Sequence, residues 1–109
     1  MKVDWFYRRS GWTSCKKAQA ALEQVEIISY GNANKEKLNR KEVENLLVQV
    51  EKVKVAKGKK TLTFDKLREE HEQILDVVLG RSGTLRSPTL RIGNQLIVGY
   101  NEELYQTFQ

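Results

Sequence analysis

The residues with the greatest chemical potential lie around Cys15, the only cysteine in a chain of 109 residues. Thr13 and Ser14 precede it and Lys16 follows it. A thiol at the start of a helix lies at the positive end of the helix dipole, and nearby cations also favour the nucleophilic thiolate. A thiol that points into an apolar core is inert instead. From the residues alone, both a reactive thiolate and a small core residue are open interpretations.

The same segment contains the groups of an anion-binding site. The first amides of a helix have no partner within the helix, and together with the dipole they attract anions. Thr13 and Ser14 would add hydroxyl donors, and Arg8, Arg9 and Arg86 would converge there if the loop before Pro88 faces the first helix. Trp12 would form a wall of the site or close it. The alternative is that Thr13 or Ser14 only caps the helix and no ligand binds.

Composition narrows the classes of partner. The chain has 19 lysines and arginines against 14 acidic residues, a net charge of +5, which favours an acidic protein surface or a small oxyanion. One cysteine and one histidine exclude an internal disulfide, a structural zinc site and a histidine metal cluster, so we expect no metal and no cofactor. No apolar run approaches the roughly 20 residues of a membrane helix, and no leader peptide is visible. We therefore expect a cytoplasmic protein without membrane contact.

Two further polar segments are given ordinary interpretations. The lysine-rich stretch 52–60 contains no aromatic residue, so nucleic-acid binding is not expected. We expect this stretch to be a solvated loop or a patch for an acidic partner. His71 lies in a charged run, between Glu70 and Glu72, and is expected to be a surface histidine with carboxylate neighbours.

The first third of the chain has the pattern of a strand, a helix and a second strand. The strands are expected at 3–7 and 26–30, and the helix at 13–24 with Thr13 or Ser14 as its cap. One buried stripe on this helix would be formed by Cys15, Ala18, Leu22 and Val25. Such a unit within about 30 residues predicts two parallel strands.

The rest of the chain changes from helical to strand periodicity. Asn39 and Glu42 form a capping-box pattern before an apolar helical face, and a second helix is expected from Phe64 to Leu79. Two alternating runs, 89–92 and 95–98, flank a Gly-Asn pair and predict a hairpin. A final short helix should begin after Asn101.

Together these elements predict one α/β domain over residues 1–109 with the outline of a thioredoxin-like fold. We expect a four-stranded mixed sheet, helices on both faces and a helical insertion from about Asn32 to Gly83. In such a fold a loop proline, often cis, faces the cysteine helix. Pro88 is the only proline and precedes the hairpin, so it should be cis and close to Cys15.

Three segments resemble the ArsC/Spx family. They are Trp12-Thr13-Ser14-Cys15-Lys16-Lys17-Ala18 with Leu22-Glu23, Leu85-Arg86-Ser87-Pro88-Thr89-Leu90, and Leu96-Ile97-Val98-Gly99-Tyr100-Asn101-Glu102. The resemblance extends over nearly the whole chain and includes the helical insertion. ArsC-type members reduce arsenate with glutathione or thioredoxin systems, and Spx-type members are redox-sensing regulators that bind RNA polymerase.

The sequence departs from the family where the family does its chemistry. Trp12 occupies the position of the nucleophilic cysteine, and Cys15 that of the second cysteine. Lysine replaces the family's arginines at Lys16 and near Lys60. The resemblance therefore implies a non-catalytic binding or regulatory protein with an acidic partner, by analogy part of the transcription machinery. The alternative is an arsenate reductase-like or monothiol enzyme that uses Cys15, with the oxyanion held by Arg8, Lys16, Lys60 and Arg86.

Overall fold

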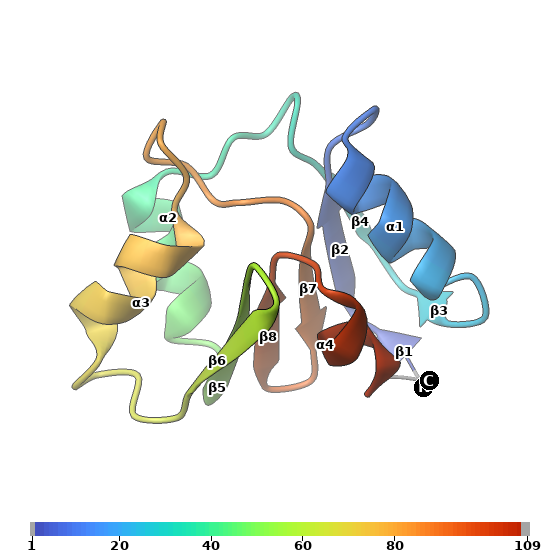
Figure 1. The fold of residues 1–109 in the computed structure, drawn as a ribbon. Helices are drawn as coiled ribbons and strands as arrows, with labels where there is room; N and C mark the ends of the chain where they lie inside the picture. The colour runs from blue at the N-terminus through green and yellow to red at the C-terminus, as the bar shows by residue number, and fades with distance from the viewer. Residues whose placement is uncertain (1, 108–109) are drawn as a thin grey trace.

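A mixed sheet of six strands runs through the fold, and helices cover both of its faces (Figure 1). The computed structural model describes residues 2–107. In spatial order the strands are β4 (Tyr30–Asn32), β2 (Trp5–Arg8), β7 (Thr89–Ile92), β8 (Gln95–Val98), β5 (Lys52–Lys57) and β6 (Lys60–Phe64). A separate parallel pair is formed by β1 (Lys2–Val3) and β3 (Glu26–Ile27). The α/β class is as predicted, but the prediction of four strands was wrong.

The two additional strands come from the lysine-rich stretch. β5 and β6 pair antiparallel across Gly58, so the segment predicted as a loop within a helical insertion is a β-hairpin. β5 also pairs in parallel with β8 and joins the hairpin to the main sheet. The predicted helix from Phe64 to Leu79 is correspondingly shorter, because Phe64 ends β6 and α3 covers only His71–Val78.

The predicted strand–helix–strand unit is present. β2 lies parallel to β4, and α1 (Thr13–Ala21) connects them along the chain. Each predicted strand is divided in two, so the first becomes β1 and β2 and the second becomes β3 and β4. The break lies at Asp4 and Ser29, where the Ser29 hydroxyl donates to the Asp4 carbonyl and the Asp4 carboxylate accepts the Gly93 amide.

Capping side chains begin two helices as predicted. Asn39 and Glu42 form a capping box at the start of α2 (Arg40–Leu47). The Asn101 side chain accepts the Leu104 amide, 2.7 Å away, at the start of α4 (Glu102–Gln106).

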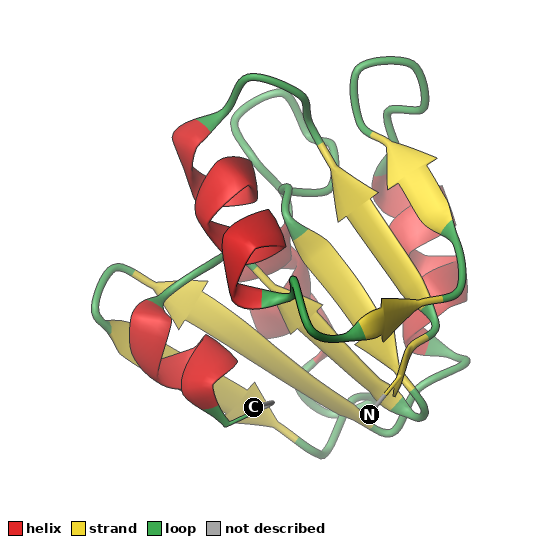
Figure 2. Ribbon diagram, turned by 90° about the vertical axis from the view of Figure 1, so that its right-hand side faces the viewer, coloured by secondary structure: helices red, strands yellow, loops and turns green. Residues whose placement is uncertain are grey.

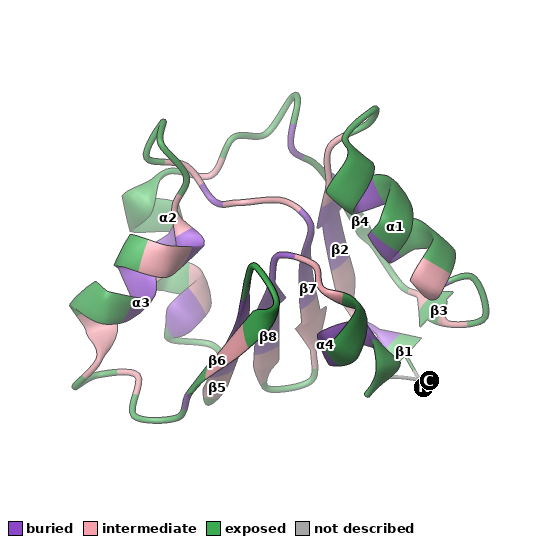
Figure 3. Cartoon of the chain, in the orientation of Figure 1, coloured by how far each residue is buried: buried purple, intermediate pink, exposed green. Residues whose placement is uncertain are grey.

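The sheet separates two apolar cores. One core packs beneath α1 and α4, and the other beneath α2 and α3. Figure 2 shows the strands with helices in front of and behind them, and Figure 3 shows the buried residues gathered between these layers. On β8, Leu96 and Val98 enter one core and Ile97 the other, and all three side chains are fully buried.

The loop before the β7–β8 hairpin contains a cis peptide between Ser87 and Pro88, as predicted. The Pro88 carbonyl accepts the Gly99 amide at 2.8 Å and joins this loop to the residue that follows β8. The β7–β8 hairpin itself has the predicted boundaries and turn. Among residues 2–107, no helix combines the length and apolar character needed to span a bilayer.

Candidate functional site

Cys15 lies on the first turn of α1 with its side chain directed into the core. Its exposed fraction is 3%, and Ala18 and Leu22 continue the same buried stripe. The Arg9 amide donates to Cys15 Sγ, with 3.3 Å between nitrogen and sulfur. The thiol is thus a packed side chain that also accepts a hydrogen bond from the loop above it.

The start of α1 differs from the prediction. Trp12, and not Thr13 or Ser14, is the N-cap residue, with extended backbone and no side-chain capping bond. Thr13 is the first helical residue, and both hydroxyl side chains are exposed. An indole has no oxygen that could accept an amide hydrogen bond at this position, so α1 begins without the side-chain cap that α2 and α4 have.

The loop between β2 and α1 is closed by a contact between a cation and an aromatic ring. The Arg9 guanidinium lies over the Trp12 ring, 4.3 Å from its centroid. Gly11, between them, has φ +87°, the left-handed conformation that glycine adopts readily. Trp12 is 52% exposed, so about half of its surface faces solvent beside the start of the helix.

A cavity of about 500 Å³ lies beside the start of α1, on the side of β4. Cys15 and three cations, Arg8, Arg9 and Lys16, line it, and Glu36 is its only acidic residue. It is further lined by Ser10, Gly11, Gln19, Tyr30, Gly31 and Asn32. The Arg8 guanidinium is 4.6 Å from the centroid of the Tyr30 ring and donates to the Gln19 side chain.

Arg86, predicted as an anion ligand, is bonded to the main chain elsewhere in the fold. Its guanidinium donates to the carbonyl oxygens of Val77 at 3.0 Å and Ala56 at 3.2 Å. Desolvation by burial lowers the pKa of Arg86. It does not line the cavity beside Cys15. Its observed contacts fasten α3 and β5 to the loop before Pro88.

Lys60, the other predicted cation from a distant segment, is the first residue of β6 and lies opposite Lys57. The residue is exposed, and its carbonyl oxygen accepts a hydrogen bond of 3.2 Å from the side-chain amide of Asn101. Neither Lys60 nor the hydroxyl residues of α1 line the cavity at Cys15. The predicted set is therefore only partly assembled: Arg8, Arg9 and Lys16 meet around Cys15, and the others do not.

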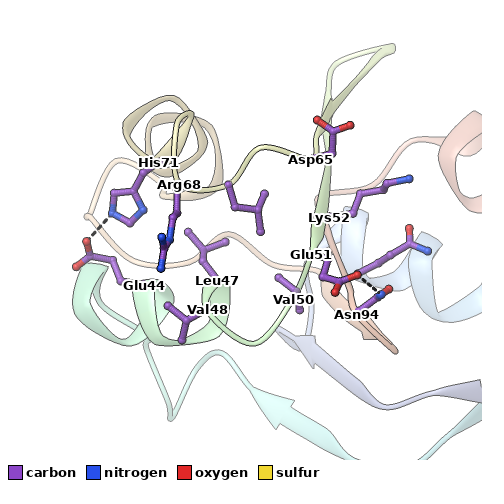
Figure 4. Close-up of a pocket in the computed structure, with 12 residues that line it drawn as sticks. Glu44, Leu47, Val48, Val50, Glu51, Lys52, Asp65, Arg68, His71 and Asn94 are labelled. Carbon is purple, nitrogen blue, oxygen red and sulfur yellow. Dashed lines mark hydrogen bonds and ion pairs between the residues drawn. The ribbon is translucent and has the colours of Figure 1, made fainter.

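A larger cavity, of about 830 Å³, was not anticipated from the sequence (Figure 4). It lies between α2, α3 and the first residues of β5. Leu47, Val48, Val50 and Leu67 provide its apolar lining, and Val48 is 82% exposed. Its charged lining residues have both signs, Glu44, Glu51 and Asp65 against Lys52 and Arg68, and His71 lines it as well.

His71 is partly exposed and has a carboxylate neighbour, as expected, but this carboxylate comes from a distant segment of the chain. Its Nε2 atom lies 2.7 Å from a carboxylate oxygen of Glu44, and not against the glutamates beside it in sequence. Figure 4 shows this pair at one end of the large cavity, with Glu51 and Asn94 joined at the other. Because His71 and Glu44 are 27 positions apart, no local pattern could have paired them.

Comparison of the chain with models of known protein families and with curated proteins finds no match. Within residues 2–107, no group of three or more histidine, cysteine, aspartate or glutamate side chains is placed to hold a metal ion.

Proposed function

We propose that the chain is a non-catalytic binding or regulatory protein of ArsC/Spx-like, thioredoxin-like type. The observation that carries this proposal is the burial of Cys15. Attack on a substrate requires an exposed thiolate within reach of it, and the only sulfur nucleophile in the chain is 3% exposed beneath the β2–α1 loop. Trp12, at the position where the resemblance places the nucleophile, has no group that attacks.

The strand arrangement supports the thioredoxin-like part of the proposal. Four neighbouring strands, β4, β2, β7 and β8, make a mixed sheet in which β2 is parallel to β4 and antiparallel to β7. The cis peptide before Pro88 introduces the terminal hairpin. Both features are expected of that fold. The β5–β6 hairpin would then be an extension of the sheet on its β8 side.

The expected partner is an acidic protein surface, with the transcription machinery suggested only by the resemblance. The net charge of +5 favours such a partner and makes its association dependent on salt concentration. Capture on the immobilised chain should therefore recover a specific acidic protein at low salt and lose it as salt rises. Failure to recover one would contradict the proposal.

A second candidate function is favoured by one observation, the basic cavity that Cys15 lines with Arg8, Arg9 and Lys16. A small oxyanion fits its charge, and a reductase that uses Cys15 would need such a site. Against it, Arg86 and Lys60 do not line this cavity.

Thiol alkylation at neutral pH tests the proposal against this alternative. We expect iodoacetamide to label Cys15 roughly 100-fold more slowly in the folded chain than in urea, because labelling must await an opening of the β2–α1 loop. The matched control is the double variant Thr13→Cys, Cys15→Ser, which moves the thiol to an exposed position on the same turn. That variant should react at the rate of a free thiol.

Equal labelling rates in the parent chain and in the control would contradict a buried, inert Cys15. Arsenate-dependent consumption of a thiol reductant by the parent chain, abolished by Cys15→Ser, would establish the enzyme in place of the binding protein.

A further inference from the structure

The outer edge of β6 presents unpaired backbone groups. Gly58–Lys59 is a two-residue turn, so Lys57 and Lys60, which flank it, are expected to form a hydrogen-bonded pair. Such pairs alternate with pairs that are not hydrogen-bonded along an antiparallel ladder. Thr61 and Thr63 therefore belong to the second kind, and their N–H and C=O groups point away from β5.

No other segment takes up these groups. β6 is the last strand in the sheet order, and between residues 2 and 107 no backbone hydrogen bond joins Thr61 or Thr63 to a further strand or loop. The Asn101 side chain contacts only the Lys60 carbonyl and the Thr61 hydroxyl here, each at 3.2 Å. A row of free edge groups is a template for another strand.

The charge of this hairpin selects the partner. Its five lysines are Lys52, Lys54, Lys57, Lys59 and Lys60, and the stretch 52–60 has no acidic residue. In the described part of the chain none of the five forms an ion pair. The stretch thus carries a charge of +5, as large as the net charge of the chain. Like charges oppose edge-to-edge pairing of two copies, whereas an acidic strand is attracted.

The alternation along β6 adds a second requirement. Lys60 and Leu62 point to the same face, because they are two residues apart in a strand. Lys60 is exposed and Leu62 is half-buried against the core beneath α2 and α3. A strand paired with β6 would therefore gain from an acidic side chain opposite Lys60 and from an apolar side chain opposite Leu62.

We propose that β6 is the docking edge for an extended acidic segment of a partner protein. The segment adds a seventh strand to the sheet, exchanges backbone hydrogen bonds with Thr61 and Thr63, and alternates acidic and apolar side chains along the face shared by Lys60 and Leu62. This inference rests on the proposed binding function, for which it names the surface and the chemistry of the partner.

The test uses a fluorescent peptide in which every second residue is threonine and the residues between are glutamate and valine in turn. Fluorescence anisotropy measures the binding of this peptide to the full chain. Two modified peptides have N-methyl groups on one or the other alternate set of amides. Only one set faces β6, so one modified peptide should lose binding and the other should bind like the parent peptide.

Variants of the chain test the same edge from the protein side. Thr63→Pro removes an outward-facing N–H and leaves the β5–β6 ladder intact, and it should weaken binding by about tenfold. Lys60→Glu should weaken binding more than the matched Lys35→Glu, which makes the same charge change at an exposed residue outside the hairpin. Circular dichroism checks that each variant is folded.

Equal binding of both methylated peptides, or undiminished binding to Thr63→Pro, would overturn strand pairing. If Lys60→Glu still weakened binding in that case, the proposal of an acidic partner would be retained and only its pairing with β6 as a strand would be contradicted. The rate at which iodoacetamide labels Cys15 tests the proposed binding function, and its outcome is independent of these peptide measurements. Self-association that Thr63→Pro abolishes would assign the edge to a second copy of the chain and would overturn the acidic segment.

Discussion

Gly99 leaves room for the Arg86 guanidinium, and a larger residue at its position would crowd that group. A Cβ atom on Gly99 would lie 2.9 Å from Arg86 Nη2 and 3.1 Å from the Ala56 carbonyl oxygen, and the backbone there has φ +82°. Gly11 has a similar φ of +87° with nothing within 4 Å of a Cβ atom. The two glycines share the backbone requirement and differ in the space around them.

Gly99→Ala should therefore destabilise the chain more than Gly11→Ala. The strained backbone alone costs about 1 kcal/mol at Gly11, whereas Gly99→Ala adds displacement of Arg86 from its carbonyl partners, for a total of about 2–4 kcal/mol. Urea unfolding of both variants measures the difference. Equal losses would mean that Arg86 moves aside at no cost.

The sequence offers the burial of Cys15 as one of two interpretations, and it does not show what surrounds the thiol. The spacing of Cys15, Ala18 and Leu22 follows one helix face, which is local information, and the structure bears it out. The positions of Arg86 and Lys60 depend on segments that lie far apart in the chain. The motifs near these two residues in the sequence therefore could not show that Arg86 bonds to the carbonyls of α3 and β5, or that Lys60 lies beside Lys57.

The first turns of α1 and α2 differ in how their free amides are satisfied. At α2 the Asn39 side chain accepts the Glu42 amide at 3.0 Å and the Glu42 side chain accepts the Asn39 amide at 3.2 Å. At α1 the cap residue, Trp12, supplies no such bond. Hydroxyl residues near the predicted start of a helix therefore do not locate its N-cap, because the backbone conformation of the cap residue also has to be known.

Asn39→Ala should lower the free energy of unfolding by about 1 kcal/mol, because the Glu42 amide loses the Asn39 side-chain oxygen that accepts its hydrogen bond, whereas the Asn39 backbone amide can still donate to the Glu42 side chain. Thr13→Ala should change it by no more than a few tenths of a kcal/mol, because Thr13 is exposed and lies inside the helix. Thermal unfolding of the two variants measures this contrast. A large loss for Thr13→Ala would show that its hydroxyl caps α1 in solution.

The β5–β6 hairpin shows where a compositional argument fails. Lysine and valine alternate from Lys52 to Val55, which is the period of a strand, and Gly58–Lys59 is a two-residue turn between strands. High lysine content predicts a solvated loop, but the valines are fully buried and decide the outcome. The pattern was therefore sufficient for the hairpin, whereas its parallel pairing with β8 is a long-range contact that no local pattern contains.

Two buried tyrosines, one in each core, couple the stability of the fold to pH. Burial raises the pKa of Tyr105 strongly, with smaller contributions from Cys15 and Tyr100. Burial also raises the pKa of Tyr7, whose hydroxyl donates to the Glu36 carbonyl. Above pH of about 10 the unfolded chain loses phenol protons that the folded chain retains, so ionisation favours unfolding.

The free energy of unfolding should therefore fall as pH rises above about 10, by up to about 1.4 kcal/mol per pH unit for each retained proton. Tyr105→Phe should reduce this slope relative to the parent chain, and Tyr7→Phe should do the same. Urea unfolding between about pH 8 and pH 11 measures the slope. An unchanged slope in both variants would show that these phenols ionise in the folded chain as they do in the unfolded one.

The two tryptophans lie in contrasting surroundings, and this gives the chain two separate optical reporters. Trp5 is half-buried and stacked on Tyr7, with 5.1 Å between ring centroids, whereas Trp12 is 52% exposed beneath Arg9. Iodide, an anionic quencher, should therefore act mainly on red-shifted emission from Trp12. Trp12→Phe should remove that quenchable component and leave fluorescence from Trp5, which reports unfolding of the sheet. If iodide still quenched the emission of this variant, the exposed indole would be Trp5. Emission of the parent chain could then follow a ligand at the β2–α1 loop without any attached dye.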